Sequence, residues 1–104
     1  MTMTAAITVL GAGSYGTALA ICLARNGHQT LLWGRNREDM ALMASSRINQ
    51  RYLPDVVLPA PLSLTDDLVA AVQASQNVLV VVPSHAFADT LRQIKPYLLP
   101  HARV

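Results

Sequence analysis

The chain has 104 residues, of which 52% are hydrophobic and 13% charged, and its formal net charge is +2. A chain of this length fits one domain, and this composition indicates a globular protein with ample core rather than a disordered one. The small net charge gives no support for nucleic-acid binding or for electrostatic binding to a membrane surface. No apolar run reaches the ~20 residues that span a bilayer.

The most informative stretch is a β-prone apolar run at residues 4–10 that ends in three spaced glycines, Gly11, Gly13 and Gly16. The run predicts a buried strand, and helical periodicity begins directly after the glycines. Strand, Gly-x-Gly-x-x-Gly and helix in this order are the context that the dinucleotide-binding fingerprint requires. The pattern therefore favours nucleotide binding over an ordinary strand–turn–helix with flexible glycines.

Each glycine of the fingerprint has a physical role. Gly11 permits a tight turn, Gly13 lets a pyrophosphate approach the backbone, and Gly16 lets the helix pack closely on its strand. The backbone N–H groups of Ser14, Tyr15 and Gly16, with the positive end of the helix, are expected to bind that pyrophosphate.

The helix after the glycines is predicted to bury one apolar face and to end at Asn26, with Gly27 beyond its C-terminus. The apolar positions at helical spacing are Tyr15, Ala18, Leu19, Cys22 and Leu23. Cys22 is thus expected to be a small buried residue. As the single cysteine it cannot form an internal disulfide, which indicates a reducing compartment. Residues 1–6 lack the basic region of a secretory signal, so we predict the cytoplasm.

The second strand is predicted at residues 29–33, which completes a parallel βαβ unit. Asn36 is expected to cap a second helix that turns Met40, Met43 and Ala44 inward.

The middle of the chain is less regular. Residues 49–62 contain three prolines, which predict an extended or looping segment, with a short strand at 62–64. Thr65 or Asp66 is expected to cap the next helix, which runs to about Ser75. That helix is predicted to bury one face, formed by Leu68, Ala71 and Val72.

The valine-rich run at residues 77–82 predicts a parallel strand that is buried on both faces. Pro83 and Ser84 end it and open another helix, with Ser84 as a candidate cap and Pro96 as the residue that truncates or kinks the helix. The apolar stripe of this helix is Phe87, Leu91, Ile94 and Leu98. Residues 102–104 are expected to begin a further strand.

This order of elements predicts an α/β fold with a doubly wound parallel sheet, a Rossmann-type dinucleotide-binding domain over residues 1–104. The chain is expected to stop within or before the fifth strand. A ligand should bind at the carboxyl ends of the strands. An open sheet edge and an uncovered helix face predict weak self-association, with a homodimer as the candidate assembly.

The loop after the second strand bears on the choice of cofactor. NAD-specific domains carry an Asp or Glu here, but this chain has Arg35 and no acidic residue before Glu38. A guanidinium grips a 2′-phosphate through charge-assisted hydrogen bonds, whereas a carboxylate repels it. We therefore favour NADP, as NADPH, with NAD as the second candidate. The alternative is that Arg35 is an ordinary solvated side chain.

The loop after the valine strand should lie near the pyrophosphate or nicotinamide half of the cofactor. Phe87 is either a core residue or an aromatic wall beside the nicotinamide. His85 is more often a surface residue in such a position, so no catalytic residue is assigned. His28 and His101 have no partner at ligand spacing, so no metal site is predicted.

Four blocks of residues, matched in order and spacing, resemble the N-terminal part of the bacterial NAD(P)+ sn-glycerol-3-phosphate dehydrogenases. The blocks are VLGAGSYGTALA at 9–20, LWGR at 32–35, YLP at 52–54 and VVVPSH at 80–85. The resemblance implies reversible reduction of dihydroxyacetone phosphate to sn-glycerol 3-phosphate for phospholipid synthesis. It also implies that Ser14, Tyr15 and Arg35 contact the cofactor and that Pro83 and Phe87 line its nicotinamide side.

Members of this family are much longer than 104 residues. Their helical C-terminal domain supplies most of the substrate site. Two lysines, one that contacts cofactor and substrate and one that is catalytic, lie after the position that corresponds to Val104. Lys95, the chain's one lysine, does not match either. We therefore expect an N-terminal fragment that binds cofactor and takes a small phosphorylated substrate only with that second domain. Two alternatives stay open: another two-domain NADP reductase of the ketopantoate-reductase type, and a non-catalytic nucleotide-sensing domain.

Overall fold

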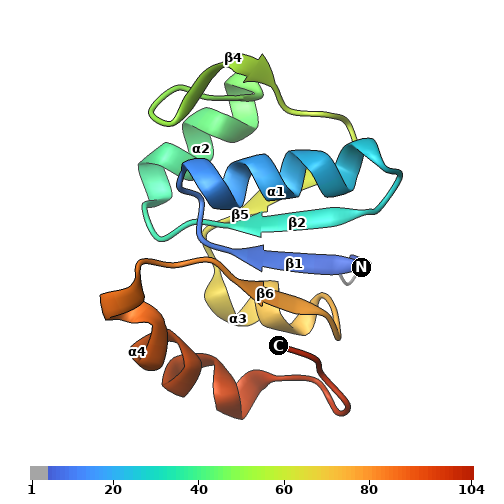
Figure 1. The fold of residues 1–104 in the computed structure, drawn as a ribbon, viewed down its shortest axis with the longest axis vertical. Helices are drawn as coiled ribbons and strands as arrows, with labels where there is room; N and C mark the ends of the chain where they lie inside the picture. The colour runs from blue at the N-terminus through green and yellow to red at the C-terminus, as the bar shows by residue number, and fades with distance from the viewer. Residues whose placement is uncertain (1–4) are drawn as a thin grey trace.

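The computed structural model describes residues 5–104, so Thr4, the first residue of the predicted first strand, lies outside them. Four parallel strands form the central sheet in the order β5–β2–β1–β6. They are β1 (Ile7–Leu10), β2 (Thr30–Trp33), β5 (Leu62–Thr65) and β6 (Val78–Val80). Helices α1 (Ser14–Arg25) and α2 (Arg37–Ser46) cover one face, and α3 (Leu68–Gln73) and α4 (Ser84–Ile94) cover the other (Figure 1). This confirms the predicted doubly wound α/β fold.

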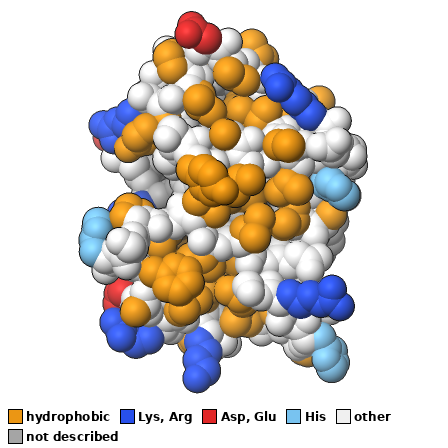
Figure 2. Space-filling model, viewed as in Figure 1, with side chains coloured by type: hydrophobic (Ala, Val, Ile, Leu, Met, Phe, Trp, Pro, Cys, Tyr) orange, Lys and Arg blue, Asp and Glu red, His pale blue; other side chains and the backbone are white. Residues whose placement is uncertain are grey.

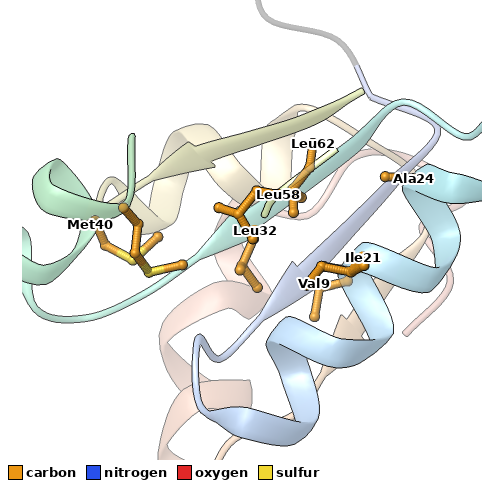
Figure 3. Close-up of a cluster of buried hydrophobic side chains, with 9 residues drawn as sticks. Val9, Ile21, Ala24, Leu32, Met40, Leu58 and Leu62 are labelled. Carbon is orange, nitrogen blue, oxygen red and sulfur yellow. The ribbon is translucent and has the colours of Figure 1, made fainter. Parts of the chain in front are cut away.

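Side chains that alternate along the strands build two cores. Val9 and Leu32 face α1 and α2, where they pack with Ile21 (Figure 3), whereas the adjacent residues Leu10 and Leu31 face α3 and α4. All four strand residues are fully buried. Such burial on both faces is typical of parallel strands covered by helices, and it explains the apolar runs in β1 and β2.

The buried face of helix α1 overlaps the predicted one only in part: Leu19 and Leu23 are half-buried, and Leu23 packs against the core, but the fully buried residues are others. The buried residues are Gly16, Thr17, Ala20, Ile21 and Ala24, whereas Tyr15 is 69% exposed and Cys22 is also exposed. The cause is Gly16, because a Cβ atom there would overlap the carbonyl oxygen of Gly11. The glycine must therefore face the sheet, and the positions four and eight residues later face it too. The prediction that α1 ends at Asn26–Gly27 is confirmed.

Helix α2 begins as predicted, since the side chain of Asn36 accepts the N–H of Asp39 at 2.9 Å. Met40 and Met43 are buried, but Ala44 is exposed, contrary to the prediction. The helix lies over the edge strand β5, so its buried stripe is narrow.

The segment predicted as extended or looping forms a small antiparallel ribbon outside the main sheet. It pairs β3 (Ile48–Asn49) with β4 (Leu53–Val57), and residues 50–52 connect the two strands. Strand β5 then confirms the short strand predicted at residues 62–64. In Figure 1 the ribbon lies beside α2 at the top of the molecule.

The second half departs from the predictions in its caps and in one strand. Asp67, rather than Thr65 or Asp66, caps α3, because its carboxylate accepts the N–H of Ala70 at 3.1 Å. Within residues 5–104, strand β6 is not buried on both faces: Leu79, which is in register with the buried Val9 of β1, is 37% exposed.

The last elements follow the predicted order with one further correction. Helix α4 has Pro83 at its N-cap position and no side-chain cap, so Ser84 does not act as the cap. The helix ends before Pro96, in the 3-10 turn η1 (Lys95–Tyr97), as the proline predicted. Arg103 then forms a parallel bridge with Asn77, which is how a further strand would begin. Among residues 5–104, none of the helices has the length and apolarity to cross a membrane.

Candidate functional site

A groove opens where the order of the sheet reverses. From β1 the chain moves outward to β2 and β5, and then returns to place β6 on the other side of β1. At this point the Val81 N–H donates to the Leu10 carbonyl at 2.7 Å, and the Gly11 N–H donates to the Trp33 carbonyl at 2.9 Å. The loops after three neighbouring strands are thereby held together. This crevice is where doubly wound sheets bind ligands.

Two adjoining cavities make up the groove. One, of about 320 Å³, lies toward β6 and includes Val81, Val82, Pro83 and His85 in its lining. The other, of about 170 Å³, lies toward α2 and the ribbon loop. Both are lined by Ala12, Gly13, Arg35 and Tyr52. The glycine turn therefore lies at the middle of the groove, with space on either side of it.

The three glycines of the fingerprint are required for different reasons. At Gly11, φ is +123° and a Cβ would overlap the Val81 carbonyl, while a Cβ at Gly16 would overlap the Gly11 carbonyl. Both glycines are thus required by the packing of the protein itself. At Gly13, no described atom lies within 4 Å of the Cβ position. The protein leaves this space open, which fits a ligand that approaches the backbone there.

The start of α1 presents free donors to this space. The first backbone bond of the helix is from the Thr17 N–H to the Gly13 carbonyl, at 3.0 Å. Within residues 5–104, the N–H groups of Ser14, Tyr15 and Gly16 have no acceptor, and the first turn carries no acidic side chain. Unpaired N–H groups at a positive helix end form an anion site. The geometry therefore fits the pyrophosphate of a dinucleotide.

Cationic side chains surround the cavity near α2. Arg35 is exposed and forms no ion pair within the described part of the chain. Arg51 also lines this cavity, and its Nη1 lies 3.4 Å from Oδ2 of Asp39. The one carboxylate in the lining of this cavity is thus already paired. Such a set of charges suits a phosphate group.

The structure brings four of the predicted site residues together. They are Gly11, Gly13, Arg35 and Pro83, and all four line the larger cavity.

The other four predicted site residues lie outside the lining of the groove. Gly16 is buried against the glycine turn, and the side chains of Ser14 and Tyr15 are exposed beside it. Phe87 is 43% exposed on α4, so it is neither a core residue nor part of the lining. A contact of Ser14 or Tyr15 with a ligand in the groove would therefore be made by the backbone N–H groups.

The family to which the chain belongs follows from a comparison with known protein families. The model of the NAD-dependent glycerol-3-phosphate dehydrogenase N-terminus matches residues 6–104. The chain belongs to this family. The predicted resemblance to it is thereby confirmed, in preference to a reductase of the ketopantoate type.

Individual dehydrogenases of the family match over almost the whole chain. The NAD(P)+ glycerol-3-phosphate dehydrogenases of Pseudoalteromonas translucida and Colwellia psychrerythraea are 65% and 64% identical over 103 and 104 residues. The crystal structure of the Coxiella burnetii enzyme is 38% identical, with a TM-score of 0.90 over 96% of this chain. The Saccharomyces cerevisiae enzyme, at 22% identity and a TM-score of 0.85 over 99% of this chain, shares the fold. The chain spans about 31% of the length of the two bacterial relatives and of the Coxiella structure, and 32% of the yeast structure.

Sequence reasoning missed the part of the groove that the ribbon contributes. Arg51 and Tyr52 line it, although they lie in a segment predicted as extended or looping, where Tyr52 was named only within the YLP block. Gly34, which belongs to the LWGR block but was not predicted as a site residue, lines the smaller cavity; a Cβ there would overlap the sulfur of Met40 and come within 2.9 Å of the Ala12 Cβ. Nothing local in the sequence indicates that residues 51 and 52 fold back onto the glycine turn.

Proposed function

We propose that the groove binds NADP(H) and that the protein uses it to reduce dihydroxyacetone phosphate to sn-glycerol 3-phosphate. The observation that carries the proposal is the open space at Gly13 beside the unpaired N–H groups of Ser14, Tyr15 and Gly16. Donors and space coincide at the switch point of the sheet, where the pyrophosphate of a dinucleotide binds.

The two cavities suggest how the cofactor lies. Its adenosine half would occupy the cavity lined by Gly34 and Arg35, and its nicotinamide half the cavity lined by Val81 and Pro83. Arg35 would then meet the 2′-phosphate, since no carboxylate pairs with it among the described residues. This arrangement supports NADP, with NAD as the second cofactor.

The chain's own residues would bind and orient the cofactor. The bound dinucleotide would supply the hydride. Val81, Val82 and Pro83 give the nicotinamide cavity an apolar wall, which limits the water that reaches the reacting face. Hydride transfer to a ketone also needs a cation or acid for the charge that develops on its oxygen. Lys95 lies in η1, at the far end of α4 from the groove.

We propose that substrate binding and catalysis use residues in the part of the relatives' length that this chain does not span. No lysine lines either cavity of the groove, and the two places in it that suit a phosphate, at Gly13 and at Arg35, are both assigned to the cofactor. The proposal that the protein reduces dihydroxyacetone phosphate is therefore based on its family and not on residues of this groove.

We also propose a cytoplasmic location and assembly as a homodimer. The free thiol of Cys22 is exposed, which suits a reducing compartment. Hydrophobic side chains gather on the face formed by α1 and the ribbon (Figure 2). They include Ala18, Leu53 and Val56, which line a cavity of about 340 Å³ together with the buried Ile21. A surface of this kind favours association, and sedimentation of the purified protein tests it.

The binding proposal is tested by titrating the purified protein with NADPH. Trp33, the one tryptophan of the chain, lines the nicotinamide cavity, so its fluorescence should fall as bound NADPH accepts energy from it. A saturable decrease that excess NADP+ reverses supports the proposal. A decrease that grows linearly with NADPH, with no effect of NADP+, would reject it. Oxidation of NADPH by dihydroxyacetone phosphate, measured on protein of the relatives' full length, tests the reaction.

A further inference from the structure

We infer that Arg51 is a second residue that determines specificity for the 2′-phosphate of NADP(H), and that Asn49 positions it. The inference rests on the proposed function, since it requires that the groove binds a dinucleotide. It concerns the loop at residues 50–52, which connects β3 to β4 outside the main sheet.

Asn49 ties this loop to the glycine turn. Its side chain is 3% exposed, and its amide nitrogen donates to the carbonyl of Ala12 at 3.1 Å and to Oγ1 of Thr17 at 2.8 Å. Its Oδ1 accepts the N–H of Tyr52 at 3.2 Å. One buried side chain thus joins the fingerprint, the first turn of α1 and the ribbon loop. Both donors and the acceptor of the amide are used, which fixes its orientation.

The consequence of this anchor is that Arg51 lies in the same cavity as Arg35. The two arginines come from different elements, one after β2 and one from the ribbon, and Gly13 lines the cavity with them. Tyr52, the next residue, lines both halves of the groove. Without Asn49 the ribbon loop would have no side-chain bond to the glycine turn among the described residues. The position of Arg51 therefore depends on that amide.

The present partner of Arg51 can be exchanged for a phosphate. The Arg51–Asp39 pair is 3.4 Å long, and its side chains are 64% and 39% exposed. An exposed ion pair of this kind contributes little stability, whereas a phosphate carries more charge than a carboxylate and offers three acceptor oxygens. A ribose 2′-hydroxyl offers Arg51 no such charge. Arg51 should consequently favour NADPH over NADH.

The decisive measurement is the dissociation constant for NADPH and for NADH, determined on Arg51→Gln by the Trp33 titration. We expect the constant for NADPH to rise about tenfold and that for NADH to stay within about twofold. Arg92→Gln is the matched control, because Arg92 forms a similarly exposed pair with Asp89 at 3.5 Å on α4, outside both cavities. It should change neither constant.

Asn49→Ala tests the positioning role. A merely structural role would weaken both cofactors equally and lower the melting temperature, whereas positioning of Arg51 should lower the preference for NADPH. In the Arg51→Gln background, Asn49→Ala should leave the ratio of the two constants unchanged, because the residue it positions is already absent. Thermal melts of each variant show that the titrated protein is folded.

Three results would overturn the inference. An unchanged ratio in Arg51→Gln, with the unaltered protein binding NADPH, would remove the phosphate role of Arg51 but leave the proposed function standing. If the double variant prefers NADPH over NADH even less than Arg51→Gln does, Asn49 does not act by positioning Arg51. Absence of binding of either dinucleotide to the unaltered protein would reject the proposed function together with the inference.

Discussion

Gly13→Val should abolish cofactor binding and leave the domain folded. No described atom lies within 4 Å of the Cβ position at Gly13, and the backbone there is extended, with φ −75° and ψ −170°. Valine adopts this conformation readily. The folding cost is therefore limited to a poorer N-cap, about 1 kcal/mol or less, which corresponds to roughly 4–8 °C in the melting temperature of a domain of this size.

The cost to binding is much larger. A side chain at Gly13 would fill the space between the pyrophosphate and the N–H groups of Ser14 and Tyr15. Each hydrogen bond to a charged group contributes about 1.5–3 kcal/mol, so the loss of two amounts to about 3–6 kcal/mol. This corresponds to a fall in affinity of roughly a hundredfold to more than ten-thousandfold.

The matched control is Gly16→Ala, which adds a smaller group at a packed position. Its Cβ would overlap the Gly11 carbonyl, and such overpacking costs about 1–3 kcal/mol. NADPH titration and thermal melts on both variants should therefore separate them: Gly13→Val stays stable but does not bind, and Gly16→Ala loses stability. Affinity of Gly13→Val equal to that of the unaltered protein would refute the assignment of the pyrophosphate site. A melting temperature as low as that of Gly16→Ala would refute the claim that this space is open.

Three further predictions use the same assays. Arg35→Asp should weaken NADPH by roughly ten- to a hundredfold and NADH far less, because the new carboxylate repels the 2′-phosphate; equal losses would show that Arg35 does not contact it. Gly27→Ala should lower the free energy of unfolding by about 1 kcal/mol, through backbone strain alone, since φ is +90° and its Cβ position is free; an unchanged urea midpoint would contradict this. The 104-residue chain alone should not oxidise NADPH with dihydroxyacetone phosphate, because no lysine lines its groove; turnover above a buffer control would disprove it.

The elements that could be predicted from the sequence are those with local signals. The strand, the glycine turn and the capped start of α2 each depend on residues within a few positions of one another. The exposure of Leu79 could not be predicted in this way, because it depends on which helices cover the face of β6. A valine-rich run has the same composition in a central strand as in an outer one.

The part of the site that escaped prediction is formed by long-range contacts. Asn49 contacts residues 37 and 32 positions away in the sequence, Ala12 and Thr17. Those bonds bring a proline-rich segment, in isolation an unremarkable loop, against the fingerprint. The residue types there, Arg51 and Tyr52, are common in exposed loops as well as in nucleotide sites. The partners of Asn49 are thus determined by the tertiary fold, and the residues near Asn49 in the sequence do not indicate them.

The partly wrong face predicted for α1 shows how two sequence signals compete within one helix. Apolar periodicity selected the positions with the larger side chains, Tyr15, Leu19 and Leu23. The fingerprint contains a stricter signal, because its third glycine, Gly16, packs directly against the Gly11 carbonyl and leaves no space for a Cβ. A helix position that only glycine can occupy must face the sheet, and the residues four and eight positions later, Ala20 and Ala24, must face it too. In a Gly-x-Gly-x-x-Gly helix, steric exclusion at the last glycine therefore decides the buried face, and the small residues that follow it indicate that face better than the large ones do.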